Sequence, residues 1–221
     1  RGSEYVILDF DRLANMIQKG VVIMTDRLFR ALIAVAMTLL LAGCGGANLR
    51  YVHTAPEAKD FKPKKVALFP VDAGMYPEAQ GVVEKVMAGV LIERGRFSRV
   101  VTADSVNKLV ETREDFKKLY SEYMTKLKMV SFSDPELSKG IGETIHADAF
   151  LLVTVDYWNY VLQGDDKVAK VGLSMKLVEA ATGKIMWKAA HEEVRGYKLI
   201  KPALADVAKS LAKDMISRMP H

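Results

Sequence analysis

The sequence predicts an α/β fold: a single mixed β-sheet with parallel βαβ crossovers at the front, a C-terminal antiparallel meander, and packed helices. Residues 65–71 (KVALFPV) are almost all apolar, as in a strand buried on both faces. Residues 78–95 then carry apolar side chains at helical spacing. Near the C-terminus, residues 167–178 (KVAKVGLSMKLV) alternate apolar and polar side chains, which is typical of a strand between hairpin turns.

The front half of the domain alternates strands and helices. After the helix at 78–95, residues 97–102 (FSRVVT) predict a second strand. The charged, aromatic segment 111–130 predicts helix. Asp134 predicts the N-cap of a further helix over 135–146, with Pro135 in its first turn. Strands that alternate with helices in this way form parallel crossovers.

The back half predicts three strands joined by tight turns, over 149–162, 167–178 and 184–194. Gly183 lies in the second turn, where we expect a positive φ. Trp187 should be buried and share a sheet face with Ile185 and Ala189. A striped helix closes the chain, with apolar residues at Leu204, Val207, Leu211, Met215 and Met219.

Composition excludes several classes of function. The net charge of +5 is spread along 221 residues, without a basic block or interleaved aromatics, so nucleic acid is not an expected partner. A single cysteine, Cys44, excludes an internal disulfide framework and any zinc site that needs two thiolates. The four histidines fall in no metal-binding spacing, so no metal and no cofactor are predicted.

The surroundings of Cys44 indicate its role. The eleven residues 31–41 are apolar except for Thr38, which is too short for a bilayer span and fits the core of a secretory signal. The four residues Leu41-Ala42-Gly43-Cys44 resemble the lipobox of bacterial lipoproteins. That resemblance implies diacylglyceryl transfer to the Cys44 thiol, cleavage before it and a durable lipid anchor. A buried structural cysteine is the alternative. Gly45, where an Asp would retain an enterobacterial lipoprotein at the inner membrane, implies the outer membrane, facing the periplasm.

The signal predicts the domain boundaries. Residues 1–23 precede a plausible start at Met24 and are interpreted as upstream sequence read in frame; a genuine N-terminal extension is the alternative. Residues 24–43 are predicted to be the lipoprotein signal peptide, and residues 44–62, with glycines and mixed polar residues, a tether. Residues 63–221 are the predicted periplasmic α/β domain.

Over residues 63–219 the order of motifs resembles the periplasmic α/β domain of several lipoprotein families. The motifs are KVALFPV before a long helix, RFSRVVTADSVNKLV, HADAFLLVTV and the hairpin KLVEAATGKIMWKA. The families are the curli-secretion lipoprotein, the lipoprotein activators of penicillin-binding proteins and the N-terminal domain of TolB. The resemblance implies binding or assembly rather than catalysis.

One strand carries the candidate binding residues. If the strand over 149–162 alternates regularly, Trp158 and Tyr160 share a half-polar face with Thr154 and Asp156, as partner-binding surfaces often do. The alternative is that a helix covers this face and both rings are core.

The leading functional interpretation is a lipid-anchored, non-enzymatic envelope protein that binds another envelope protein or copies of itself. A subunit of an oligomeric secretion pore is the first alternative. A cell-wall-acting enzyme is the second, and no catalytic motif supports it: Glu192 and Glu193 are adjacent in a strand, face opposite sides and cannot flank one bond.

Overall fold

The structure is a computed structural model that describes residues 50–130 and 133–220. The predicted signal peptide and the lipobox residues Leu41, Ala42, Gly43 and Cys44 lie outside the described residues, as does the extension over 1–23. The boundaries proposed for these segments therefore stay predictions.

The described part confirms the predicted α/β class, with one mixed sheet and helices packed on it. The strands are β1 (Tyr51–Thr54), β2 (Lys65–Leu68), β3 (Arg99–Val101), β4 (Ala149–Gln163), β5 (Asp166–Glu179) and β6 (Ile185–Gly196). The α-helices are α2 (Gln80–Arg94), α3 (Ala103–Thr112), α4 (Glu114–Val130), α5 (Pro135–Ile145) and α6 (Leu204–Ser217). Two short 3-10 helices are η1 (Pro56–Lys59) and η2 (Pro77–Ala79).

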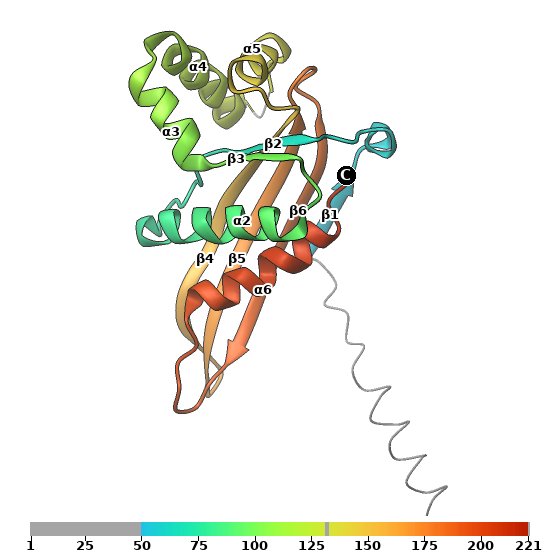
Figure 1. The fold of residues 1–221 in the computed structure, drawn as a ribbon. Coiled ribbons are helices and arrows are strands. Elements are labelled where there is room, and N and C mark those ends of the chain that lie inside the picture. The colour runs from blue at the N-terminus through green and yellow to red at the C-terminus, as the bar shows by residue number, and fades with distance from the viewer. Residues whose placement is uncertain (1–49, 131–132, 221) are drawn as a thin grey trace, which may run out of the picture. The chain divides into compact units, whose positions relative to one another are not determined.

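The strand order in the sheet is β1-β6-β5-β4-β2-β3 (Figure 1). Strand β2 pairs in parallel with β3 and β4, and the remaining pairs are antiparallel. The chain crosses from β2 to β3 through α2 and from β3 to β4 through α3, α4 and α5, so helices lie on both faces. The parallel front and the antiparallel back are thus arranged as the sequence predicts.

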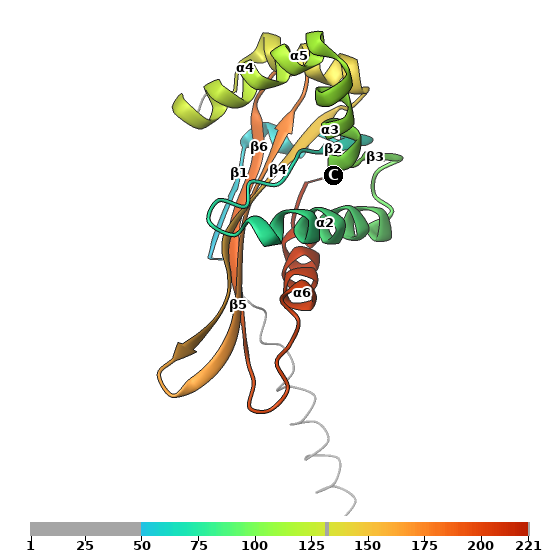
Figure 2. The ribbon, with the colours of Figure 1, turned by 90° about the vertical axis from the view of Figure 1, so that its left-hand side faces the viewer.

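The helices cover the two faces of the sheet unequally. Helices α2 and α6 pack along one face over a large core that contains Met87, Leu211 and Trp187. Helices α3, α4 and α5 pack on the other face over a smaller core around Phe69, Tyr123 and Phe150, where β4 begins and β5 ends. Figure 2 shows these three helices gathered at the upper end of the sheet, with α2 and α6 on the opposite side below them.

The folded domain begins earlier than residue 63, which corrects the predicted tether over 44–62. Strand β1 pairs with β6, with Tyr51 opposite Ala190 and Thr54 opposite Trp187. Ala58 and Phe61, on and after η1, are buried in the larger core. Residues 50–62 therefore belong to the domain, because backbone pairing and two apolar anchors hold them.

Two β-bulges correct the predicted faces of β4 and β6. The β4–β5 register shifts between Val155 and Tyr157, so Asp156 is an extra residue and every later side chain changes face. Trp158 therefore joins the larger core instead of sharing a face with Thr154. In β6 a second shift beside Met186 places Ile185 against the smaller core. The prediction that Ile185 shares a face with Trp187 is therefore wrong.

Other local predictions are confirmed. Trp187 is fully buried on the same face as Ala189. Gly183 has a φ of +67° in the turn between β5 and β6. Asp134 caps α5, because its carboxylate accepts hydrogen bonds from the backbone N–H groups of Glu136 and Leu137.

Candidate functional site: the open face of the sheet

The lower part of the sheet carries helices on one side only (Figure 2). On the other side, within the part of the chain that the structure describes, the surface consists of strand side chains below α3, α4 and α5. We call this surface the open face. Its residues are Tyr51 of β1, Asp156 and Tyr157 of β4, Lys170 and Ser174 of β5, and Ala190 and Glu192 of β6.

A network of polar contacts orders the side chains of the open face. The Ser174 hydroxyl donates a hydrogen bond of 2.6 Å to an Asp156 carboxylate oxygen. Glu192 accepts from the Arg50 guanidinium and pairs with the Lys170 ammonium, each at 3.2 Å. The Lys170 nitrogen also lies 3.9 Å from the centroid of the Tyr157 ring, a cation–π geometry. These contacts hold charged and aromatic side chains of the open face in defined positions.

Gly172 explains why the Tyr157 ring lies close to the sheet. The two residues face each other across β4 and β5. A Cβ atom added to Gly172 would lie 2.6 Å from the Tyr157 Cδ2 atom, so only glycine leaves room for the ring. The bulge at Asp156 turns Tyr157 onto this face. Bulge and glycine together place an aromatic ring against the backbone of β5 on the open face.

A wide hollow of about 650 Å³ occupies the centre of the open face. Arg50, Tyr51 and Tyr157 line it together with Met75, which is 86% exposed, and Asp156. Arg, Tyr and Met are the residue types enriched at protein–protein interfaces. Such a broad, shallow surface suits another protein better than a small molecule, because small-molecule sites enclose most of the ligand.

The two aromatic residues singled out from the sequence lie elsewhere. Trp158 is 7% exposed and packs in the core under α2 and α6. Tyr160 is half-buried, and its hydroxyl donates a hydrogen bond of 2.8 Å to the Pro202 carbonyl. Trp158 thus matches the alternative in which a helix covers this face and the ring is core. A partner-binding role for Trp158 and Tyr160 stays a prediction, and neither ring forms part of the open face.

Sequence reasoning missed the residues that do form the open face. Tyr51 lies in the stretch interpreted as a tether, and Tyr157 falls on the core face if β4 alternates regularly. The signal that could have found them is the pair Gly172 and Tyr157, since a glycine in the middle of an otherwise alternating strand often marks a close approach or a bulge.

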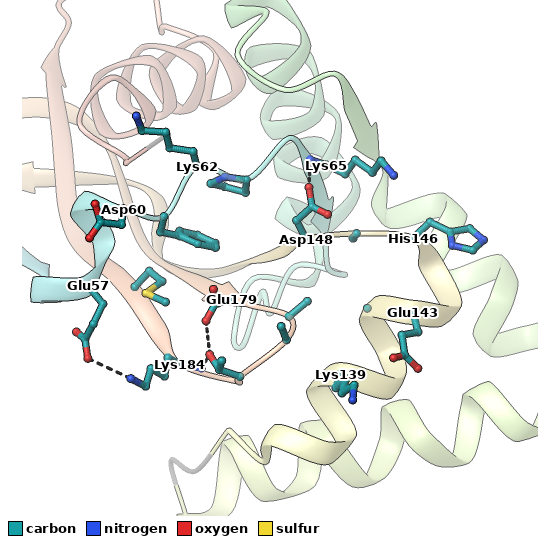
Figure 3. Close-up of a pocket in the computed structure, with 18 residues that line it drawn as sticks. Glu57, Asp60, Lys62, Lys65, Lys139, Glu143, His146, Asp148, Glu179 and Lys184 are labelled. Carbon is teal, nitrogen blue, oxygen red and sulfur yellow. Dashed lines mark hydrogen bonds and ion pairs between the residues drawn. The ribbon is translucent and has the colours of Figure 1, made fainter.

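A second hollow, of about 680 Å³, lies where β2 and β4 begin (Figure 3). Two of its carboxylates have side-chain partners in the hollow: Glu57 accepts a hydrogen bond of 3.1 Å from Lys184, and Glu179 accepts one from the Thr182 hydroxyl. The Asp148 carboxylate accepts from the backbone N–H of Lys65 at 2.9 Å and so fixes the entry to β2. Figure 3 shows the Glu143 carboxylate separate from these pairs, on α5. We therefore assign Glu57, Glu179 and Asp148 to local structure.

The predicted opposition of Glu192 and Glu193 is confirmed. Glu192 lies on the open face against Lys170, whereas Glu193 lies opposite Val171 in the ladder and pairs with Arg195 at 2.5 Å. Two carboxylates on opposite sides of a sheet cannot act on one bond.

Ion pairs hold α4 from both sides. The Lys128 ammonium binds the Asp72 carboxylate at 2.8 Å, and this hydrogen bond lowers the pKa of Asp72 below its usual range. The Lys126 ammonium binds Asp134 at 2.8 Å, and this contact, together with the α5 cap hydrogen bonds, lowers the pKa of Asp134. Burial raises the pKa of the Tyr120 hydroxyl, which therefore stays protonated. These charges connect α4 to the loop after β2 and to α5.

The described residues contain neither a membrane-spanning helix nor a metal cluster. Over 50–130 and 133–220, no helix has the length and hydropathy needed to cross a membrane. Within the same ranges, no group of three His, Cys, Asp or Glu side chains could hold a metal ion.

Fold and site define a mixed α/β domain that carries a preorganised, partly uncovered sheet face. No protein-family model and no curated protein matches the chain. Solved structures with a similar arrangement include the PelC dodecamer from Paraburkholderia phytofirmans, with 20% identity, a TM-score of 0.48, and coverage of 77% of this chain and 95% of that one. Lipoprotein GNA1162 from Neisseria meningitidis has 15% identity and a TM-score of 0.44, over 70% of this chain and 99% of that one.

A minor lipoprotein from Acinetobacter baumannii has 10% identity and a TM-score of 0.37, over 71% of this chain and 92% of that one. At these identities the likeness concerns the fold alone. The resemblance to the curli-secretion, activator and TolB families stays a prediction.

Proposed function

We propose that this chain is a lipid-anchored, non-enzymatic envelope protein whose periplasmic domain binds another protein through the open face. The observation that carries the proposal is the open face itself: ordered charges and exposed Tyr and Met side chains on a sheet surface that no described helix covers. A buried, satisfied network of this kind would be ordinary core. On an uncovered surface it is a preformed binding site.

The anchor is the first part of the proposal. Cys44 follows an apolar signal core and a four-residue box of the lipoprotein type, so its thiol is the proposed acylation site. Gly45 supports the outer membrane as the destination. Labelled palmitate should enter the wild-type chain, and Cys44→Ser should abolish both the labelling and signal cleavage, because a hydroxyl is a poor substitute for the thiolate. Palmitate uptake by the Cys44→Ser chain would overturn the anchor.

Binding without catalysis is the second part. On the open face, the Asp156 carboxylate accepts a hydrogen bond from the Ser174 hydroxyl, and Glu192 pairs with the Lys170 and Arg50 cations. Charges arranged in this way give orientation and specificity to an encounter.

A photo-crosslinking experiment tests the binding surface. A photoreactive phenylalanine replaces Tyr51, which is 50% exposed on the open face, and the full chain is irradiated in intact cells. The matched control carries the same group at Ile92, which is 61% exposed on α2, on the other side of the sheet. We expect a discrete adduct from position 51 and none of that mass from position 92.

The adduct's mass identifies the partner. A multiple of the chain's own mass means self-assembly, the result that a pore subunit also predicts, and any other discrete mass means a different envelope protein. Tyr157→Ala should weaken the adduct in either case, because it removes the ring that lies beside Lys170. Equal adducts at both positions, or none at position 51, would overturn the assignment of the open face.

A further inference from the structure

Two adjacent apolar side chains protrude from the loop between β6 and α6. Leu199 is 97% exposed and Ile200 is 88% exposed, the two most exposed large hydrophobic residues among the described ones. Isolated exposed apolar residues are common, but two in succession at a loop tip leave their full apolar area in water. Lys198 and Lys201 flank them, so the tip reads Lys-Leu-Ile-Lys.

The base of this loop is firmly held. The Tyr197 backbone N–H donates to the Lys167 carbonyl at 2.9 Å, and the Tyr160 hydroxyl donates to the Pro202 carbonyl at 2.8 Å. The Tyr160 and Tyr197 rings meet edge to face with centroids 6.0 Å apart. The fold therefore presents the apolar pair from a fixed position.

The charge around the tip is positive. Lys198 and Lys201 supply it, and the Lys201 ammonium lies 3.5 Å from the centroid of the Tyr160 ring. The acidic turn at Asp165 and Asp166 belongs to the β4–β5 hairpin, which Figure 2 shows curving to the side of the sheet away from α6. Apolar side chains framed by lysines are suited to the headgroup region of an anionic bilayer.

Chain length places the tip within reach of a membrane. Six residues lie between Cys44 and Tyr51, and the seven Cα–Cα steps span at most about 25 Å, so an acylated Cys44 holds the start of β1 within that distance of the lipid. Strand β1 runs antiparallel to β6, so its first residue, Tyr51, lies toward the end at which β6 finishes. From Ala190, opposite Tyr51, to Gly196 at the end of β6 is a rise of about 20 Å.

We propose that residues 198–201 form a second membrane contact, with Leu199 and Ile200 inserted at the headgroup boundary of an anionic bilayer and the lysines at its surface. The contact goes beyond the proposed binding function. It uses the Cys44 anchor only as the device that keeps the tip near lipid, and the two can fail separately.

A fluorescent probe at the tip tests the contact. Leu199→Cys is made in the full chain with Cys44→Ser, so that position 199 holds the only thiol, and is labelled with an environment-sensitive dye. The uncleaved chain is reconstituted in vesicles of phosphatidylcholine and phosphatidylglycerol. Dye emission should move to shorter wavelength and be quenched by lipid-borne quenchers. Ile92→Cys, labelled in the same way, should show neither change, because Ile92 is a solvent-exposed residue of α2 and lies outside residues 198–201.

Charge reversal tests the lysines. Lys198→Glu with Lys201→Glu should reduce the quenched fraction and the affinity for anionic vesicles about fivefold per lysine, equivalent to about 1 kcal/mol each. Equal quenching at positions 199 and 92, an unshifted emission at 199, or a shift that occurs only when envelope protein is added would overturn the membrane contact. Palmitate labelling of Cys44, measured separately, reports the anchor and leaves this result unaffected.

Discussion

Trp187 is the largest fully buried side chain, and its indole Nε1 atom has no hydrogen-bond partner among the described residues. Trp187 therefore stabilises the fold through the volume that it fills and not through a hydrogen bond. Trp187→Ala should lower the free energy of unfolding by about 3–5 kcal/mol, because the cavity would lie between the sheet and α6. Chemical denaturation of the soluble domain measures it.

Trp187→Phe is the matched control. It keeps most of the ring volume and removes an unsatisfied donor, so its loss should be much smaller. Equal losses for the two variants would show that the indole N–H has a partner after all.

Alanine substitutions at two turn glycines can distinguish the cost of a strained backbone from the cost of a steric contact. Gly183 and Gly164 have φ values of +67° and +62°. A Cβ at Gly183 would lie 2.8 Å from the Ser133 carbonyl oxygen, whereas a Cβ at Gly164 meets nothing within 4 Å. Both alanine variants should lose about 1–2 kcal/mol to the left-handed backbone, and Gly183→Ala should lose more. Thermal unfolding that ranks the two equally would contradict the contact with Ser133.

The bulge in β4 is a feature of the element rather than of one side chain. Deleting Asp156 would return Trp158 and Tyr160 to the opposite face and move Tyr157 into the core, because side chains alternate with a period of two. The deletion should abolish cooperative unfolding. Asp156→Ala keeps the bulge and removes only the Ser174 hydrogen bond, so it should stay folded. A deletion variant with wild-type stability would mean that the strand can slip back into register.

Two ionised carboxylates, Asp72 and Asp134, form ion pairs with lysines near the C-terminal end of α4. The pKa values of Asp72 and Asp134 are lowered in the folded chain, so their stabilisation is fully present above the unfolded pKa of about 3.9 and is lost as pH falls through the folded values. Asp72→Asn with Asp134→Asn should flatten the loss of stability below about pH 4. Asparagine preserves the α5 cap. An unchanged acid profile would place the acid sensitivity elsewhere.

The contrast between predictable and unpredictable elements has a physical basis. The helix stripes and the alternation over 167–178 report burial directly, so the order of elements from β2 to α6 could be predicted from sequence. Bulges leave no periodic signal, because one inserted residue reverses the face only of the residues after it, as at Asp156 and Met186. Strand β1 was missed because four exposed residues carry no burial pattern and their pairing partner lies about 140 positions away. The open face depends on the Asp156 bulge and on β1, and of these two only the bulge has a sequence signal, the glycine at position 172.

At the scale of the whole molecule, the N-terminal edge decides where the domain can be cut. A chain that starts at residue 50 keeps β1 and both buried anchors, Ala58 and Phe61. A chain that starts at residue 63, the boundary suggested by composition, loses them. The shorter chain should be less stable by about 3–5 kcal/mol, the usual effect of removing a buried Phe. Denaturant midpoints compare the two, and equal midpoints would return residues 50–62 to the tether.

Strand β1 can also detach from the sheet and so lengthen the chain between Cys44 and the core. Its four side chains are all exposed, and the first buried residue after it is Ala58. Tension on the N-terminal side would therefore act on the short β1–β6 ladder before any core residue is disturbed. Peeling residues 51–57 would release about 25 Å of chain and double the reach of an anchor at Cys44. Single-molecule pulling from position 44 should show this extension as a first, reversible step below the force of global unfolding.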